Sequence, residues 1–216
     1  MTARGFDIDA AYAHLLRRDR VLAKWMRRIG PLPADPRWRQ AFDPVDALAR
    51  AILYQQLSGK AAATIVGRVE KAVGARRLHA DALGRVEDAT LRACGVSGNK
   101  VAALRDLAAH ESQGELPDLQ RMKRMDDAEI VATLTRVRGI GQWTVQMLLM
   151  FRMGRPDVLP VDDLGIRKGA QLVDGAEAMP APRLLAERGA GWGPYRTLAS
   201  MYLWRVADSA GGKASA

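Results

Sequence analysis

Apolar residues recur at the spacing of an α-helix along most of the chain, and this pattern constrains the fold most strongly. After Asp43-Pro44, for example, the apolar residues fall on one helical face: Val45, Leu48, Ile52 and Leu53. An aspartate before a first-turn proline is typical of a helix start, because its carboxylate accepts an amide proton that has no partner inside the helix. No run alternates apolar and polar residues as a half-buried strand would. The sequence therefore predicts an all-α protein.

Capping residues place further helix starts and stops. We expect Ser58 to cap a helix that Gly74 ends, since glycine accepts the left-handed backbone conformation that often closes a helix. Asp126 and Glu129 form a capping-box pattern ahead of the next apolar stretch. Gly193-Pro194 is expected to start the last helix. The chain is thus read as many helices of ordinary length.

Length and residue usage exclude several classes of protein. The 216 residues suffice for one domain or two small lobes with an apolar core. The chain has no run of about 18 apolar residues, the length that would span a membrane. Met1–Tyr12 lacks the apolar stretch of a secretory signal, so a cytoplasmic location is expected. The single cysteine, Cys94, cannot form a disulfide within the chain or hold an iron–sulfur cluster. The three histidines, His14, His79 and His110, are too far apart in sequence to form a ligand-spaced cluster.

The chain is basic, with 33 Lys and Arg against 24 Asp and Glu, a formal net charge of +9. This balance fits a polyanionic partner such as nucleic acid. A solvated basic surface without such a partner gives the same composition, so charge alone leaves both readings open.

The most informative stretch is 134–144, where a helix ends, Gly139-Ile140-Gly141 forms a turn, and a helix begins. Glycines bring backbone amides to the surface, and the positive end of a helix N-terminus favours phosphate. Ile140 is expected to pin the turn to the core. An ordinary connection between two helices has the same pattern, so the turn by itself does not establish phosphate binding.

Four segments in order together resemble the HhH-GPD superfamily of DNA glycosylases. The hairpin, at about 130–153, resembles the helix-hairpin-helix of that family, and 155–168 carries an aspartate at the expected distance. Asp-Leu-Gly-Ile after a proline is similar to the 3-methyladenine DNA glycosylase II branch, as are 54–62 and 191–205. The resemblance covers about residues 43–205.

The resemblance implies a fold and an activity. It implies two helical lobes with an active-site cleft between them, in a glycosylase domain spanning 1–208 and followed by a disordered tail at 209–216. The β-rich N-terminal domain of some bacterial members is not expected, because 11–28 reads as helix. The implied activity is monofunctional base excision: a monomer flips alkylated purines out of damaged double-stranded DNA and hydrolyses the N-glycosidic bond, which leaves an abasic site.

Two adjacent aspartates compete for the catalytic position. Ile166, three residues further on, selects Asp163 by its match to the family, and Asp162 is then expected to cap the following helix. A carboxylate can stabilise the positive charge that grows on the sugar as the base leaves, and can orient or deprotonate water. An alkylated base that is already cationic needs little acid assistance.

The resemblance also assigns the residues that would receive the flipped nucleotide. The base pocket is expected to be lined by Trp143, Met147, Trp192 and Tyr54. The indole rings favour a cationic purine, although a core role is the alternative for the aromatic residues. The wedge that fills the gap in the duplex is expected among Gln55, Gln56 and Leu57, and the sequence does not decide between Gln56 and Leu57.

Backbone amides and small polar residues are expected to hold the DNA phosphates. These residues are Gly139, Gly141, Gln142, Thr144, Ser58, Lys60, Ser97, Gly98 and Lys100. The turn at 97–100 could equally be an ordinary helix cap that holds no phosphate.

The resemblance bears on cofactors as well. Bifunctional relatives carry a lysine two positions after the second hairpin glycine, where this chain has Trp143, so no strand cleavage is expected. Neither a cofactor nor an iron–sulfur cluster is expected. A Na⁺ or K⁺ ion at the hairpin is implied, held by the carbonyls of Thr135, Val137 and Ile140.

Two other functions stay open at this stage. One is a glycosylase for a different lesion, such as a deaminated or mismatched base, since details of the pocket decide the substrate. The other is a DNA-binding protein that uses the hairpin without catalysis; such a protein would not need a carboxylate like Asp163.

Overall fold

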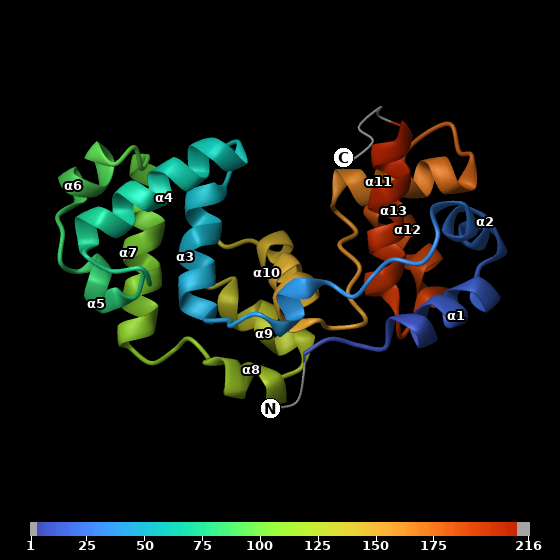
Figure 1. Cartoon of the computed structure of the whole chain (residues 1–216), viewed down its shortest axis with the longest axis horizontal. Coiled ribbons are helices and arrows are strands. Elements are labelled where there is room, and N and C mark those ends of the chain that lie inside the picture. Colours follow the sequence, from blue (N-terminus) through green and yellow to red (C-terminus); the bar gives the residue numbers. More distant parts are fainter. Residues whose placement is uncertain (1–3, 211–216) are drawn as a thin grey trace. The chain divides into compact units, whose positions relative to one another are not determined.

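The computed structural model describes residues 4–210, and within that range every regular element is a helix and no strand forms (Figure 1). The all-α prediction is therefore confirmed. The chain divides into two compact units: unit 1 comprises residues 1–40 and 146–216, and unit 2 comprises residues 41–145. The two units confirm the expected helical lobes. The cleft between the lobes and the domain boundary at residue 208 stay predictions.

Unit 1 is built around four helices whose apolar faces share one core. Its elements are α1 (Ile8–Arg18), α2 (Arg20–Ile29), the 3-10 turn η1 (Pro36–Arg39), the π-helical turn η2 (Leu149–Met153), α11 (Leu164–Asp174), α12 (Pro182–Gly189), the 3-10 turn η3 (Ala190–Trp192) and α13 (Arg196–Ala210). Leu15 of α1, Leu22 of α2, Ile166 of α11 and Leu203 of α13 are all fully buried in this core. Both ends of the described chain thus contribute to unit 1.

Glycines allow α11 and α13 to pack closely. A Cβ added at Gly169 would lie 2.0 Å from the carbonyl oxygen of Leu203, and one added at Gly165 would lie 2.8 Å from Cδ1 of Trp204. The two glycines are four residues apart and therefore share one face of α11. Larger residues at either position would push α13 away, so these glycines set the position of Trp204.

Unit 2 is a cluster of shorter helices. They are α3 (Pro44–Tyr54), α4 (Gly59–Val73), α5 (Ala80–Leu83), α6 (Asp88–Ala93), α7 (Gly98–Ser112), α8 (Leu119–Arg124), α9 (Asp127–Leu134) and the start of α10 (Gln142–Leu148). Helix α7 packs on both α3 and α5, with Leu104 and Leu107 fully buried. The boundary between the units falls within α10.

The predicted caps of unit 2 are confirmed. Asp43 caps α3 and accepts the amide proton of Asp46, and Ser58 caps α4 and accepts that of Ala61. Gly74 ends α4 in the left-handed conformation, with φ of 67°. Before α9, Asp126 and Glu129 form both hydrogen bonds of a capping box.

Three boundaries differ from the prediction. The expected helix at 11–28 is two helices, because Asp19 ends α1 and caps α2 through its side chain. Gly193-Pro194 precedes the last helix rather than starting it: the bond between them is cis, and α13 begins at Arg196. The disordered tail expected at 209–216 is wrong for 209 and 210, which continue α13, and its other residues lie outside the described range.

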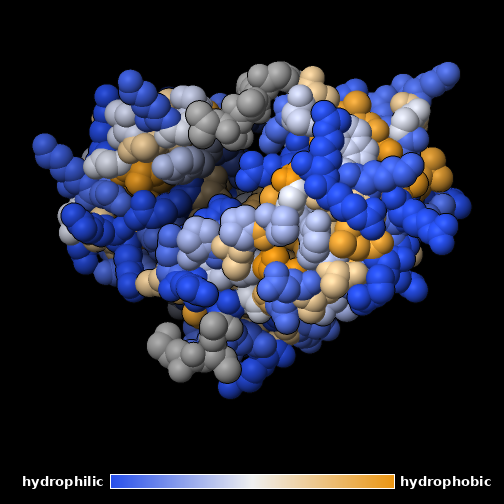
Figure 2. Space-filling view, turned by 45° about the vertical axis from the view of Figure 1, so that its right-hand side comes forward, coloured by the Kyte–Doolittle hydropathy of each residue, from blue (hydrophilic) through white to orange (hydrophobic). Residues whose placement is uncertain are grey.

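Within residues 4–210, no helix is both long enough and apolar enough to cross a membrane. Hydrophilic residues cover most of the face drawn in Figure 2, and hydrophobic ones appear there as small separate areas.

Candidate active site

Asp163 is held by two hydrogen bonds at the start of α11 in unit 1. Its Oδ1 accepts the backbone amide proton of Ile166 at 2.8 Å and the indole proton of Trp204, also at 2.8 Å. The residue is half-buried. Because both donors meet the same oxygen, they hold Oδ1 in one position.

The prediction that Asp162 caps this helix is wrong. Asp162 is exposed, and Asp163 is the N-cap residue, with an extended backbone at φ of −69° and ψ of 122°. From this position its side chain reaches the amide three residues further on, as capping requires. The cap and the candidate catalytic group are therefore one residue.

Trp204 is the site residue that sequence reasoning missed. Its ring stacks on Phe151 at 5.8 Å between centroids and 25° between planes, and the guanidinium of Arg37 lies 4.2 Å from the centroid of Phe151. The indole is thus held from behind while its N–H points at Asp163. Trp204 and Asp163 are 41 positions apart, and no spacing rule in the sequence pairs them.

Trp192 does not line a base pocket, contrary to the prediction. Its ring is 1% exposed, and its indole nitrogen donates to Oδ2 of Asp19 at 2.7 Å. The guanidinium of Arg188 lies over the same ring and also binds Asp19. Burial opposes ionisation of Asp19, but the hydrogen bonds from Arg188, Leu22 and Trp192 outweigh burial and lower the pKa of this carboxyl. Trp192 therefore stabilises the core of unit 1.

The two predicted pocket residues of unit 2 are exposed aromatic rings. Trp143, the second residue of α10, is 50% exposed, and Tyr54, the last residue of α3, is 42% exposed. The core alternative is thus excluded for both. Met147 is half-buried, one helical turn after Trp143.

The hairpin presents its backbone as the sequence predicts. Ile140 is buried at 4% exposure and pins the turn, whereas Gly139, Gly141 and Gln142 are exposed and Thr144 is half-buried. Of the two hairpin glycines, only Gly139 has a positive φ, of 79°. A Cβ on Gly141 would meet nothing within 4 Å. Gly141 therefore leaves open space beside the first-turn amides of α10, which have no carbonyl partner inside the helix.

The candidate wedge loop follows α3 directly. Gln56 is exposed and has a φ of 57°, and Leu57 is 40% exposed. The side-chain amide of Gln55 donates to the carbonyl of Gly139 at 2.7 Å, so Gln55 joins the loop to the hairpin. Gln55 is therefore a bridging residue, and the choice of wedge stays between Gln56 and Leu57.

Lys100 does not project toward solvent as a phosphate contact would. Its ammonium donates to the carbonyls of Leu53 at 2.7 Å and Gln55 at 2.8 Å, at the end of α3. Two of the three ammonium protons are therefore used within the protein, and the predicted role of Lys100 in holding the DNA backbone stays untested. The other predicted polar contacts are exposed: Ser58, Lys60, Ser97 and Gly98. Ser97 caps α7 without a side-chain hydrogen bond to the helix.

The carbonyls assigned to a monovalent cation belong to one turn. Val137 accepts the amide proton of Ile140 at 3.0 Å, which uses one of the two lone pairs of its carbonyl oxygen. Neutral oxygen donors from Thr135, Val137 and Ile140 suit a hard monovalent ion. The turn fits such an ion, and its presence stays a prediction.

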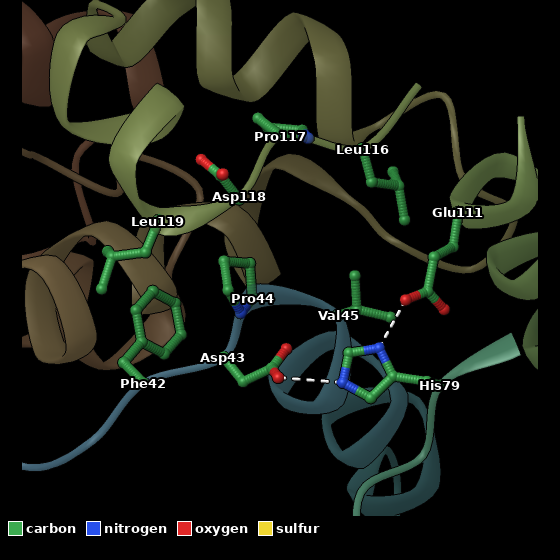
Figure 3. Close-up of a pocket in the computed structure, with 10 residues that line it drawn as sticks. All are labelled: Phe42, Asp43, Pro44, Val45, His79, Glu111, Leu116, Pro117, Asp118 and Leu119. Carbon is green, nitrogen blue, oxygen red and sulfur yellow. Dashed lines mark hydrogen bonds and ion pairs between the residues drawn. The ribbon is translucent and has the colours of Figure 1, made fainter. Parts of the chain in front are cut away.

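A separate cavity of about 330 Å³ in unit 2 contains a histidine between two carboxylates (Figure 3). Nε2 of His79 contacts Asp43 at 2.9 Å, and Nδ1 contacts Glu111. Burial disfavours the charged ring, but the hydrogen bonds to these carboxylates and their charges outweigh burial and raise the pKa of His79. Asp43 caps α3, and Glu111 also accepts the amide proton of Ala80. The cluster therefore joins α3 to α7 and serves stability.

Comparisons with known proteins agree with this geometry. The chain is 32% identical to DNA-3-methyladenine glycosylase 1 of Schizosaccharomyces pombe over 169 aligned residues. This alignment covers 78% of this chain and 74% of that protein. It is similar to the crystal structure of a DNA-3-methyladenine glycosidase from Bacillus halodurans, with 33% identity, a TM-score of 0.84 and coverage of 94% and 91%.

A second solved structure is the 3-methyladenine DNA glycosylase of Schizosaccharomyces pombe in complex with abasic DNA, with 30% identity, a TM-score of 0.77 and coverage of 91% and 95%. The family model described as HhH-GPD superfamily base excision DNA repair protein matches residues 49–194. Since this match covers more than half of the chain, the protein belongs to the HhH-GPD superfamily of base excision DNA repair proteins.

Proposed function

We propose that this protein is a monofunctional DNA glycosylase that removes alkylated purines, of the 3-methyladenine and 7-methylguanine type, and leaves an abasic site. The observation that carries the proposal is Asp163, a half-buried carboxylate whose Oδ1 is held by Ile166 and Trp204 in a member of the HhH-GPD superfamily. The relatives named above are 3-methyladenine DNA glycosylases, and this supports the substrate class.

Asp163 is the catalytic residue in this proposal. As the bond between base and sugar breaks, positive charge develops on the deoxyribose, and a fixed carboxylate stabilises that charge without reorganising. Asp163 then orients or deprotonates the water that attacks the sugar carbon, and the proton moves to the carboxylate or to solvent. The purine leaves with the bonding electrons, which its existing positive charge makes favourable.

The alkylated base has to leave the duplex before Asp163 can act. Trp143 and Tyr54 are exposed aromatic rings of unit 2 and are proposed to contact the flipped purine. An electron-rich indole face attracts a cationic ring more than a neutral one, so Trp143 favours alkylated over normal purines. Gln56 or Leu57 fills the space that the base leaves.

The reaction ends at the abasic site in this proposal. Bifunctional members of the superfamily need an amine that attacks the sugar, and Trp143 occupies the position where the resemblance places that lysine. No metal or organic cofactor is required for hydrolysis through Asp163. The carbonyls of Thr135, Val137 and Ile140 would hold a Na⁺ or K⁺ ion, which would add positive charge near a phosphate.

The hairpin amides, Ser58 and Lys60 at the start of α4, and Ser97 and Gly98 at the start of α7 are proposed to bind the phosphates of damaged double-stranded DNA. Because each neutralised phosphate releases counterions, the affinity for DNA decreases as the salt concentration rises. The protein acts as a monomer in this proposal.

The decisive experiment is base release from duplexes that each carry one damaged base, without added metal. We expect release of 3-methyladenine and 7-methylguanine and no strand cleavage before heat or alkali. Asp163→Asn should slow release by about a thousandfold and retain DNA binding. Asp162→Asn is the matched control, because Asp162 is exposed and adjacent; loss of activity in the control variant instead would contradict the assignment.

The same panel separates the alternatives. Preferred release of a deaminated or mismatched base would make the protein a glycosylase for another lesion, with Asp163 in the same role. Tight DNA binding without release of any base would identify a non-catalytic binding protein.

A further inference from the structure

Three hydrogen bonds converge on the loop that follows α3. The ammonium of Lys100 donates to the carbonyls of Leu53 and Gln55, and the side-chain amide of Gln55 donates to the carbonyl of Gly139. All of these residues belong to unit 2. The loop is therefore tied on one side to the start of α7 and on the other to the hairpin.

The loop needs such support because of how α3 ends. The last carbonyls of a helix have no amide partner inside the helix and carry partial negative charge, which a lysine ammonium stabilises. Directly after them, Gln56 adopts a φ of 57°, the single positive φ of a non-glycine residue within 4–210. A side chain with a Cβ adopts this conformation at an energetic cost, so neighbouring contacts have to hold it.

We propose that Lys100 and Gln55 are positioning residues that hold the 54–57 loop in its wedge conformation before DNA binds, and that Lys100 acts through this loop rather than by contacting a phosphate. The proposal rests on the proposed function, since it assigns the loop to base flipping. It differs from the sequence-based expectation, in which Lys100 belonged with the phosphate contacts.

The environment of Lys100 supports a role within the protein. An ammonium has three protons, and two of them are directed at carbonyl oxygens of α3 and the loop. Lys100 is half-buried, and burial lowers the pKa of its ammonium. Lys60 at the start of α4 is exposed and has the character of a phosphate contact instead.

The bond from Gln55 to Gly139 extends this support to the hairpin. Gly139 belongs to the turn that is proposed to bind phosphate, and Gln55 immediately precedes the candidate wedge residues. A single hydrogen bond therefore sets the distance between the phosphate-binding turn and the wedge. DNA held by the hairpin meets the wedge at a fixed offset along the duplex.

Salt dependence distinguishes a phosphate contact from a positioning residue. We would compare Lys100→Met with Lys60→Met, and use Lys71→Met, an exposed lysine at the end of α4, as the matched control. Binding is measured against salt concentration with a duplex that carries a tetrahydrofuran abasic analogue beside 2-aminopurine, whose fluorescence rises on unstacking. Base release is measured under single-turnover conditions with saturating enzyme.

For Lys60→Met, we expect the slope of log K against log salt to fall by about one. For Lys100→Met, we expect an unchanged slope, a smaller rise in fluorescence at saturation and base release slowed about tenfold, as for loss of a charged hydrogen bond. Lys71→Met should match the wild type. A slope that falls by about one in Lys100→Met, or an unchanged fluorescence rise and release rate, would overturn the proposal.

Hydrogen exchange keeps the test informative if Lys100→Met is poorly folded. Gln55→Ala removes the bond to the hairpin without touching Lys100, and should speed exchange of the amides of Gln55 and Leu57, which bond to Ala51 and Tyr54. Unchanged exchange in Gln55→Ala would refute the positioning role. Exchange and fluorescence need no catalysis, so they test this inference even if the wild type releases no base and the proposed function fails.

Discussion

Around Asp163 in unit 1, the chain is packed so closely that a methyl group at Gly169 would meet a backbone oxygen, whereas the hairpin of unit 2 leaves open space beside Gly141. The first region is built from side chains: an indole and an amide fix one carboxylate oxygen. The second is built from exposed backbone. This contrast follows from the proposed tasks, because a reacting group needs a fixed position and a DNA backbone needs access.

The largest effect should come from closing the space between α11 and α13. Gly169→Ala places its Cβ 2.0 Å from the carbonyl oxygen of Leu203, and we expect it to lower the free energy of unfolding by about 3 kcal/mol, as overpacking does. The matched control is Gly67→Ala in α4, where a Cβ meets nothing within 4 Å. Alanine there should raise the free energy of unfolding by roughly 0.5–1 kcal/mol. Chemical denaturation measures both, and equal effects in the two variants would remove the contrast.

The next effect concerns the indole that orients Asp163. Trp204→Phe keeps an aromatic ring against Phe151 but removes the N–H donor, so we expect single-turnover base release to slow by about tenfold, with DNA affinity unchanged. Trp25→Phe is the control, since Trp25 is also half-buried and packs on the core of unit 1. If release slows only for some damaged bases, Trp204 contacts the base rather than orienting the carboxylate.

An effect of similar size, but on DNA affinity rather than on base release, is expected on the exposed side of the comparison. Gly141→Ala adds a methyl group where the DNA backbone is proposed to approach, and should weaken DNA binding by roughly tenfold at fixed salt. Its free energy of unfolding should stay within about 0.5 kcal/mol of the wild type, because the Cβ meets open space. Fluorescence anisotropy with a tetrahydrofuran duplex measures the affinity. Undiminished affinity would exclude close approach of a phosphate at this glycine.

The smallest effect is on the pH dependence of stability. Unit 2 should lose stability as pH rises, and unit 1 should lose stability as pH falls. The pKa of His79 is raised in the folded state, so its contribution to unit 2 is complete below the unfolded value of about 6.5 and is lost as pH rises through the folded pKa. We expect a loss below about 1 kcal/mol between pH 6 and pH 8, since the site is partly exposed. His79→Gln should abolish this change in stability, and an unaltered pH profile in that variant would disprove the link.

In unit 1, Asp19 has a lowered pKa instead. Its contribution is present above the unfolded value of about 3.8 and is lost as pH falls through the folded pKa. Acid unfolding should therefore start in unit 1, and hydrogen exchange at low pH would test that order.

Sequence reasoning succeeded where the determining contacts are local. The caps at Asp43, Ser58 and Asp126 each depend on an amide three residues away, so the pattern contains the whole interaction. The hairpin and its buried Ile140 were predicted for the same reason. The family resemblance added Asp163 by motif position, and its catalytic role stays a prediction.

The errors about the contacts of Lys100, Trp192 and Trp204 all involve partners far apart in the chain. Lys100 bonds to carbonyls 47 and 45 positions earlier, and Trp192 bonds to an aspartate 173 positions earlier, so neither contact has a sequence period. Trp204 was overlooked because only the packing of α13 on α11 brings it to Asp163. A match to a family motif places these residues near the site but does not show which groups their side chains contact.

The way the chain threads the two units has a consequence for synthesis on the ribosome. Unit 2 is one continuous segment, 41–145, while unit 1 joins 1–40 to 146–216. Helices α1 and α2 share their core with α11 and α13. They emerge long before these partners, so their apolar faces stay exposed to solvent until α11 and α13 have been synthesised. Unit 2 can become compact during that interval. The nascent protein would then contain a formed hairpin, the element proposed to bind DNA, before the helix that carries Trp204 has left the exit tunnel.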